Sequence, residues 1–283
     1  MMRSPAVSRT WGFLDEIRKL SAFFRRDLLV AWSYRLAFVV DWINLFGQVL
    51  VFALVGRLID PSALPIVDGS QISYVEFVVT GIAVTTFLQI ALGRVINSIR
   101  EEQLMGTLEA LLMTPTSPAT LQVGSMMYDL AYIPVRTILF LVLASAIFGA
   151  DLNVGGFGPV VAILLVFIPF AWGIGMLGAA AVLTYRRGVN ILTFGISLLM
   201  IGSNAYVPIS VFPEWAQRAA AVNPVSIALY GSRQALLGDG GWDAAWHAIR
   251  LLFPIAVAAL GVGIMGVRFA LKRERRRGTL GLY

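Results

Sequence analysis

The sequence alternates long apolar runs with short polar segments. Most runs hold about 18 residues or more with few charges, and a helix of that length crosses a hydrocarbon core of about 30 Å. A transmembrane β-barrel would need strands of about ten residues that alternate in polarity, and the runs do not alternate. The pattern predicts an all-α integral membrane protein with six transmembrane helices, at about residues 36–56, 74–96, 121–148, 160–184, 189–207 and 249–267.

Residues 13–24 have the spacing of an amphipathic helix before the first run. Phe13, Ile17, Leu20 and Phe24 fall on one arc of such a helix, and the charged residues fall on the other. This pattern predicts an interfacial helix with its cations toward anionic lipid. No apolar core follows the first charges, so we do not expect a signal peptide. The helix either anchors the terminus or takes part in gating.

Residues 208–241 are too polar and too broken for a simple span. Pro213 can start one short helix, and Pro224 can start a second with Asn223 as its cap. Gly238 is placed to end the second helix. Neither helix is long enough to cross, so we predict re-entrant outer helices that are buried against protein, where their broken backbone is satisfied.

The docking segment (residues 100–118) lies between the second and third spans and is itself amphipathic. Pro115 and Pro118 end its helical pattern, so the chain turns before it re-enters the apolar phase. The pattern predicts a helix that leaves the membrane and docks on another protein, although a solvated loop without a partner has the same composition. The positions at helical spacing are Leu104, Leu108, Leu111 and Leu112, with Glu101, Glu102 and Glu109 among them.

The composition agrees with a membrane protein and excludes several kinds of chemistry. Hydrophobic residues make up 58% and charged residues 13% of the 283 positions, with a mean hydropathy of +0.79, whereas soluble domains are roughly 25% charged. The chain has no cysteine, which excludes disulfides, thiol nucleophiles and cysteine metal sites, and it has one histidine, His247. We therefore expect neither a metal site nor catalytic residues.

The net charge of +6 indicates topology rather than nucleic-acid binding, because the cations flank apolar runs. Most of the 22 Lys and Arg residues fall in residues 1–35, the docking segment and the residues before it, the short loop near residue 186, and the tail after residue 268. The positive-inside rule places these segments in the cytoplasm. We expect a multi-pass protein of the cell membrane, with both termini cytoplasmic and no nucleic-acid partner.

Polar residues inside the spans are candidates for structural or functional roles. Asp41, Asn44 and Gln48 share one face of the first span, which should look at protein or water because a charge in lipid is costly. Asp129 and Arg136 are seven residues apart, about 10 Å along a helix, so each should find its partner on another helix. Asp41 is a candidate partner for Arg136. We favour a charge pair that fixes helix register over a substrate site.

The order of these features resembles the permease subunit of a type-2 ATP-binding-cassette (ABC) exporter, over nearly the whole chain. The most specific part is Gly106-Thr107-Leu108-Glu109 to Thr114-Pro115 after the second span, and Asn223-Pro224 before the last span adds to it. In this family the docking segment couples the permease to its ATPase. The resemblance implies that the coupling residues are Glu101, Glu102, Leu104, Gly106, Thr107, Leu108, Glu109, Leu111, Leu112, Thr114 and Pro115.

The resemblance also implies partners and a cargo. Two copies of a cytoplasmic nucleotide-binding ATPase subunit would hold ATP and Mg²⁺, and the permease would form a homodimer or pair with a related permease in the lipid bilayer. The cargo would be an amphiphile that moves outward, such as a drug-like molecule, a lipid or a lipid-linked glycan. By analogy, the path between the copies would involve Phe38, Trp42, Phe46, Phe87, Gln89 and Asn204.

The residues independently indicate that any motor is a separate chain. A phosphate-binding loop ends in Gly-Lys-Ser/Thr, but the chain has only Lys19 and Lys272, and neither follows a glycine. We thus expect a transport subunit that is not an enzyme and binds no cofactor itself. An ion-coupled secondary transporter or channel that uses Asp41 and Asp129 is the alternative, although the internal repeat usual in such folds is not found. Whether it is a permease subunit or an ion-coupled carrier, we expect a single transmembrane domain over residues 1–283. It would consist of a cytoplasmic tail at 1–35, a membrane-embedded part at 36–267 and a basic cytoplasmic tail at 268–283.

Overall fold

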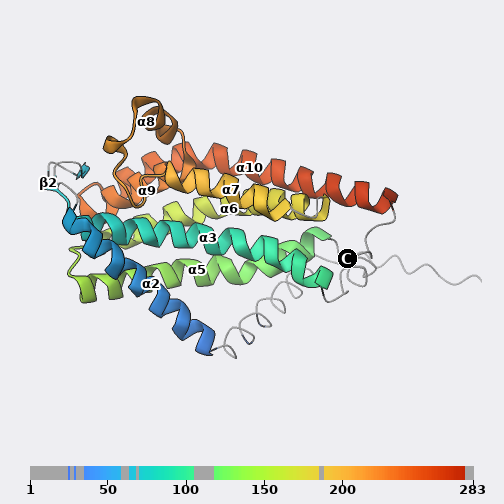
Figure 1. The fold of residues 1–283 in the computed structure, drawn as a ribbon, viewed down its shortest axis with the longest axis horizontal. Coiled ribbons are helices and arrows are strands. Elements are labelled where there is room, and N and C mark those ends of the chain that lie inside the picture. Colours follow the sequence, from blue (N-terminus) through green and yellow to red (C-terminus); the bar gives the residue numbers. More distant parts are fainter. Residues whose placement is uncertain are drawn as a thin grey trace, which may run out of the picture.

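The computed structural model describes Arg25, Leu29 and residues 35–58, 64–67, 70–104, 118–184 and 188–277. The described chain is a bundle of helices, in which α2 crosses its neighbours obliquely and the other long helices follow the long axis (Figure 1). The long helices are α2 (Arg35–Val55), α3 (Tyr74–Leu104), α5 (Pro118–Phe148), α6 (Phe157–Thr184), α7 (Gly188–Ile201) and α10 (Gly241–Arg277). The predicted amphipathic helix at 13–24 and the tail after residue 277 lie outside the described residues.

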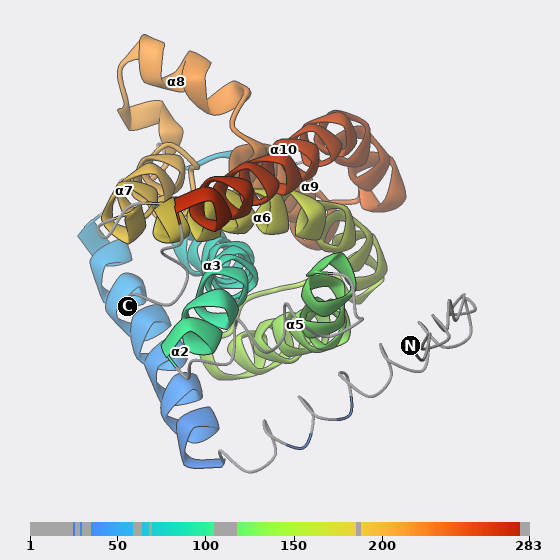
Figure 2. The ribbon, with the colours of Figure 1, turned by 90° about the vertical axis from the view of Figure 1, so that its right-hand side faces the viewer.

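Helix α3 lies at the centre of the bundle. It contacts α2, α5, α6 and α9 (Pro224–Leu237), and Figure 2 shows it surrounded by its neighbours in the view along the bundle. Thr80 and Thr85 are buried on this helix, and their hydroxyls donate to helix carbonyls one turn earlier. Polar side chains can therefore be buried in α3 without unsatisfied groups.

The largest contact between two helices joins α6 and α10. Glycines allow the two backbones to approach closely, as in many membrane helix pairs. A Cβ at Gly173 would overlap the backbone of Ala259, and a Cβ at Gly263 would overlap the backbone of Gly173. Gly173 and Gly263 thus lie at a close contact of α6 with α10, where a side chain has no room.

Three stretches of the described chain are long and apolar enough to cross a membrane, namely Tyr74–Gly93, Val154–Ala181 and Gly241–Ala270. Two shorter apolar stretches, Val39–Val55 and Tyr132–Phe148, lie in α2 and α5. These five stretches fall on five of the six predicted spans. Helices α3 and α10 extend beyond their predicted spans, α3 to Leu104 and α10 from Gly241 to Arg277.

The helix predicted for the fifth span, at about residues 189–207, is wrong at its C-terminal end, because α7 ends at Ile201. The hydroxyl of Ser203 donates to the carbonyl of Met200 at 2.6 Å, which competes with the helical ladder. Asn204 then has a φ of 63°, in the left-handed region. Residues 202–208, called here the unwound segment, therefore leave the helix inside an apolar stretch.

The two short helices after the unwound segment confirm the signals that predicted them. Helix α8 (Glu214–Ala221) follows Pro213, and α9 begins at Pro224, where the Asn223 side chain accepts from the backbone N–H of Val225 at 3.0 Å. Gly238 is the C-cap of α9. Helix α9 is buried against α3, α6 and α10, whereas α8 projects from the side of the bundle (Figures 1 and 2).

One element was missed by the sequence analysis, which expected helices only. Strands β1 (Ile66–Val67) and β2 (Ser70–Gln71) pair antiparallel between α2 and α3. The sequence between them is Asp-Gly, the dipeptide that favours a two-residue hairpin. Single-turn 3-10 helices complete the described chain at η1 (Gly56–Leu58), η3 (Val154–Gly156) and η4 (Ile209–Val211). We call the end of the bundle that carries β1 and β2 the hairpin end.

Candidate functional site

The docking segment begins as a direct continuation of α3. Glu101, Glu102 and Leu104 form the last turn of this helix, and only their backbone is described. The helix is continuous from Tyr74 to Leu104, so the start of the docking segment is rigidly joined to the centre of the bundle. The other predicted coupling residues lie outside the described part: Gly106, Thr107, Leu108, Glu109, Leu111, Leu112, Thr114 and Pro115.

An ion pair joins α2 to α5. Nη2 of Arg136 lies 2.6 Å from Oδ2 of Asp41, which is the pairing that the sequence offered as a candidate. Arg136 is 7% exposed and Asp41 is 56% exposed, so the cation is buried while the anion lies at the surface of this copy of the chain. The guanidinium carbon also lies 6.0 Å from the ring centre of Trp42. The Nε of Arg136 is buried, with no hydrogen-bond partner in the described chain.

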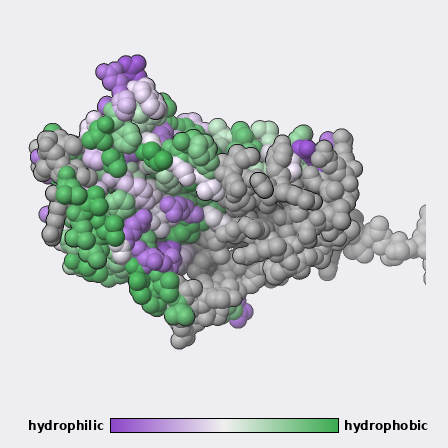
Figure 3. All heavy atoms as spheres, viewed as in Figure 1, coloured by the Kyte–Doolittle hydropathy of each residue, from purple (hydrophilic) through white to green (hydrophobic). Residues whose placement is uncertain are grey.

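Helix α2 buries an apolar stripe and leaves its polar stripe accessible. Trp42, Leu45 and Val49 are buried, whereas Asn44 is exposed and Gln48 is partly exposed. Figure 3 shows hydrophilic surface over α2 and α3 with hydrophobic surface on both sides. In a membrane such surface has to face protein or water. That Asn44 and Gln48 face a partner or water in the assembled protein therefore stays a prediction.

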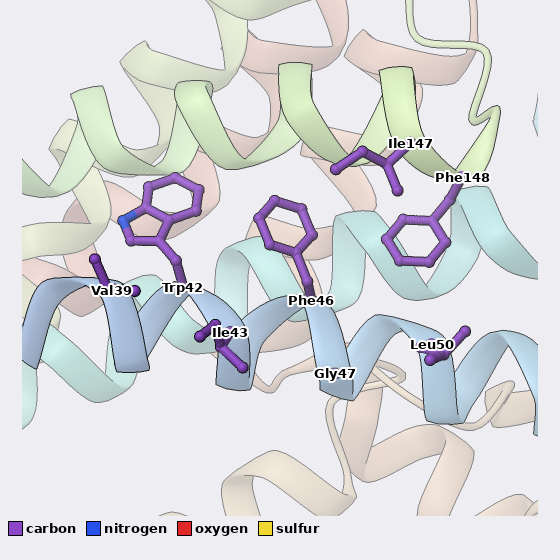
Figure 4. Close-up of a pocket in the computed structure, with 8 residues that line it drawn as sticks. All are labelled: Val39, Trp42, Ile43, Phe46, Gly47, Leu50, Ile147 and Phe148. Carbon is purple, nitrogen blue, oxygen red and sulfur yellow. The ribbon is translucent and has the colours of Figure 1, made fainter. Parts of the chain in front are cut away.

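An apolar groove of about 640 Å³ separates α2 from α5. In Figure 4, Trp42 and Phe46 point from α2 toward α5, and Ile147 and Phe148 project from α5. The ring of Phe46 lies 6.4 Å from that of Phe148, which closes one side of the groove. A Cβ at Gly47 would meet no atom within 4 Å, so this position is open. The remaining lining residues are Val39, Ile43 and Leu50.

Arg233 of α9 holds the unwound segment by its backbone. Its guanidinium is buried and donates to the carbonyls of Asn204 at 2.8 Å and Ala205 at 3.3 Å. It also donates to the carbonyl of Phe77 at 2.9 Å and to Oγ1 of Thr80 at 3.1 Å, both on α3. Sequence reasoning missed this role. The available signal was its position inside an apolar helical stretch that starts at a capped proline.

A second set of contacts fixes the unwound segment to α2 and α3. The ring of Tyr206 stacks on Phe52 with centres 4.9 Å apart, and its hydroxyl lies 2.9 Å from Oγ1 of Thr85. A Cβ at Gly81 would overlap the carbonyl oxygen of Ala205, so the glycine is needed for this approach. The broken backbone is thus satisfied by protein, as non-helical chain at membrane depth requires.

The predicted path residues do not converge on one surface within a single copy. Trp42 and Phe46 line the groove, and Gln89 is exposed on α3. Phe87 is fully buried and packs against Phe167 of α6, with ring centres 6.3 Å apart. Asn204 lies in the unwound segment, where its side chain accepts from the N–H of Ile209 at 2.8 Å. The side chains of Phe38 and Asp129 lie outside the described part of the chain.

The Asp41→Leu variant should lower the free energy of unfolding by about 1–3 kcal/mol, because it leaves the Arg136 guanidinium buried without its counterion. This loss of stability is smaller than for a fully buried ion pair, because Asp41 is half exposed. Thermal unfolding of the purified chain measures the change. Asn44→Leu, on the same face of α2, is the control and should change stability by less than about 0.5 kcal/mol. Normal stability with an altered substrate range would contradict the structural role.

Comparison with known families gives one match that spans most of the chain. The family model of the ABC-2 type transporter matches residues 18–237. The matched range includes the whole docking segment, the ion pair, the groove and the unwound segment, and it ends with α9. A comparison with curated proteins gives no match.

Proposed function

Because the chain belongs to the ABC-2 type transporter family, we propose that it is the membrane-spanning permease subunit of an exporter driven by a separate ATPase. It is a multi-pass membrane transport subunit, in keeping with its family and its long apolar helices. The outward direction, the ATPase partner and the cargo are the proposed parts. The family match over more than half of the chain is the observation that carries the proposal.

The proposed topology has six crossings with both termini in the cytoplasm. Support comes from the end opposite the hairpin, where α3, α6 and α10 end and α7 begins (Figure 1). Lys272 and Arg273 are at this end of α10, which suits an anionic inner surface. Helix α7 alone spans only about 21 Å. The unwound segment, whose backbone is satisfied by protein contacts, would supply the rest of the fifth crossing.

The proposed assembly has two permeases, identical or related, and two ATPase subunits. The accessible polar stripe of α2 supports a partner permease, because Asn44 and Gln48 need protein or water beside them in the membrane. Support for a separate motor comes from the two lysines of the chain, neither of which suits a phosphate-binding loop. The docking segment would receive the ATPase, which would hold ATP and Mg²⁺. The cargo would be an amphiphile.

The Leu108→Asp variant tests the docking segment. A buried apolar anchor is typically worth about 2 kcal/mol or more, so the charged variant should bind the ATPase at least about thirtyfold more weakly. The measurement is ATP hydrolysis that copurifies with the tagged permease from membranes. The matched control is Leu280→Asp, because Gly278-Thr279-Leu280 repeats the tripeptide of the docking segment without its amphipathic pattern.

Two other outcomes would contradict the proposed function. If copurified ATP hydrolysis persists in Leu108→Asp, the coupling contact lies elsewhere in the chain. If vesicles move cargo along an imposed ion gradient without ATP, the protein is an ion-coupled carrier, with Asp41 and Asp129 as the residues to test next.

A further inference from the structure

Helix α10 has one face that the rest of the described chain leaves uncovered along its whole length. Its other face packs on α6 and α9 through buried residues at helical spacing, such as Ala245, Leu252 and Ala256. Figure 2 shows α10 at the edge of the bundle. The uncovered face, called here the α10 stripe, carries the exposed residues Trp246, His247, Arg250, Phe253, Val257, Met265, Arg268 and Lys272.

The charges of the α10 stripe are spaced like the two boundaries of a bilayer. Arg250 and Arg268 lie on the same side of the helix, about five turns or 27 Å apart. Residues 251–267 between them carry no polar side chain. The hydrocarbon core of a bilayer is about 30 Å thick and is bounded on both sides by lipid head groups. Cations at both ends of an uninterrupted apolar surface therefore match one membrane crossing in contact with lipid.

The hairpin end of the stripe has the groups that recognise a phosphate head. A hollow in the surface is lined by Trp246, Ile249, Arg250 and Phe253, so the cation is part of the wall of the hollow. The ring centres of Trp242 and Trp246 lie 6.5 Å apart, and tryptophan is enriched in membrane proteins at the level of the head groups. A guanidinium forms strong, paired hydrogen bonds with phosphate oxygens. The hollow thus combines a phosphate-binding cation with apolar surface for an acyl chain.

A second copy of the chain fits this face less well than lipid does. Copies related by a two-fold axis along the membrane normal bring residues of similar depth together. Contact through the α10 stripe would therefore place Arg250 of one copy near the same residue of the other, and like charges repel. The carboxylate of Asp243 is about 10 Å away along the helix, too far to neutralise them. The stripe also lacks, between its cations, the amides that make the exposed face of α2 suit protein or water.

We propose that the α10 stripe faces bilayer lipid in the assembled protein, and that Arg250 binds the phosphate of a phospholipid in the leaflet at the hairpin end. The acyl chains lie along Phe253 and Val257, and Arg268 and Lys272 meet the phosphates of the opposite leaflet. This lipid is a component of the bilayer and not the cargo, because the stripe is on the outside of the bundle. The proposal needs neither the ATPase nor export, so it is tested on the purified full-length chain alone.

Single thiols map the stripe, because the chain contains no cysteine. Val257→Cys and Met265→Cys are labelled with a nitroxide in vesicles of phosphatidylglycerol and phosphatidylcholine. The measurement compares collisions with O2, which dissolves in hydrocarbon, and with a nickel chelate, which stays in water. The ratio of O2 to nickel collisions should be at least about tenfold higher at these positions than at His247→Cys and Lys272→Cys. These two controls lie on the same stripe, beyond Arg250 and Arg268.

The phosphate contact is tested by native mass spectrometry with phosphatidylglycerol. Arg250→Gln should bind one phosphatidylglycerol fewer per protomer than the unmodified chain. Arg218→Gln is the control, because Arg218 is an exposed arginine on α8, and it should keep the full number. Diacylglycerol, which lacks the phosphate, should bind the unmodified chain and Arg250→Gln equally. Because Arg250 is exposed, its replacement should change lipid binding without changing the free energy of unfolding.

Three results would overturn the proposal. A ratio of O2 to nickel collisions at Val257→Cys as low as at His247→Cys would show that the stripe does not face hydrocarbon. A disulfide between two copies of Val257→Cys would place a second permease there instead. Equal numbers of bound phosphatidylglycerol in Arg250→Gln and Arg218→Gln would remove the phosphate site. Each of these results leaves the copurification of ATP hydrolysis unaffected, so this proposal and the proposed function fail separately.

Discussion

The Gly173→Leu variant is expected to lose more than about 3 kcal/mol of stability and to accumulate poorly in membranes. A Cβ at Gly173 would overlap the backbone of Ala259, and no change of side-chain rotamer relieves an overlap with backbone. The contact joins α6 to α10, the largest helix pair of the bundle. Membrane helices associate through such close packing, so a leucine would separate them along their length.

The measurement for Gly173→Leu is unfolding of the purified protein, together with its yield from membranes. Gly261→Leu is the control, because Gly261 is on α10 and a Cβ there would meet no atom within 4 Å. The control should change stability by less than about 0.5 kcal/mol. Equal stability of the two variants would show that α6 and α10 do not pack as described.

The Arg233→Met variant is expected to lose about 2–4 kcal/mol. Methionine fills much of the same volume but donates no hydrogen bond, so the carbonyls of Asn204 and Ala205 lose the donors described above. Each buried unsatisfied polar group costs about 1–3 kcal/mol. The loss should be local as well as global: the variant should speed amide hydrogen exchange more in the unwound segment than in α3.

Arg250→Met provides the comparison for Arg233→Met. Arg250 is an exposed arginine on α10, so its replacement should leave both stability and hydrogen exchange nearly unchanged. If Arg233→Met were as stable as Arg250→Met, the guanidinium would not be what holds the unwound segment.

The parts of the fold that follow from the sequence depend on interactions within one helical turn. The Asn223 side chain caps α9 two residues away, and Pro224 and Gly238 act at its first residue and at its cap. Such helix-capping signals depend only on residues close together in the sequence, so they can be recognised without the structure. The pairing of Asp41 with Arg136 was also foreseeable, because each charge within a span needs a partner and few are available.

The end of α7 could not be placed from hydropathy, because the apolar run continues through Ala205 and Val207. The helix ends where contacts from distant parts of the chain stabilise another conformation. Gly81 gives the unwound segment room on α3, and Arg233 supplies the donors for its carbonyls. These partners are more than twenty residues away in sequence, so no local pattern announces them.

Two residues of the groove were named from the sequence, but by analogy with the family and not from a pattern in the residues. Trp42 and Phe46 were candidates by analogy, but the opposite wall comes from Ile147 and Phe148, about a hundred residues later. Whether an aromatic residue of an apolar span faces a groove, the core or lipid depends on helix packing. Phe87 illustrates the same point, since it had the same composition signal and lies in the core.

Helix α3 has a mechanical consequence that follows from its continuity. Its 31 residues contain no proline and form one rod of about 45 Å, joined to the docking segment at one end and to the unwound segment near the other. A rod that tilts by roughly 10° about its middle moves its two ends by about 4 Å in opposite directions. A push at Leu104 would thus be converted by this lever into an opposite displacement at the hairpin end, with the unwound segment carried along by Arg233.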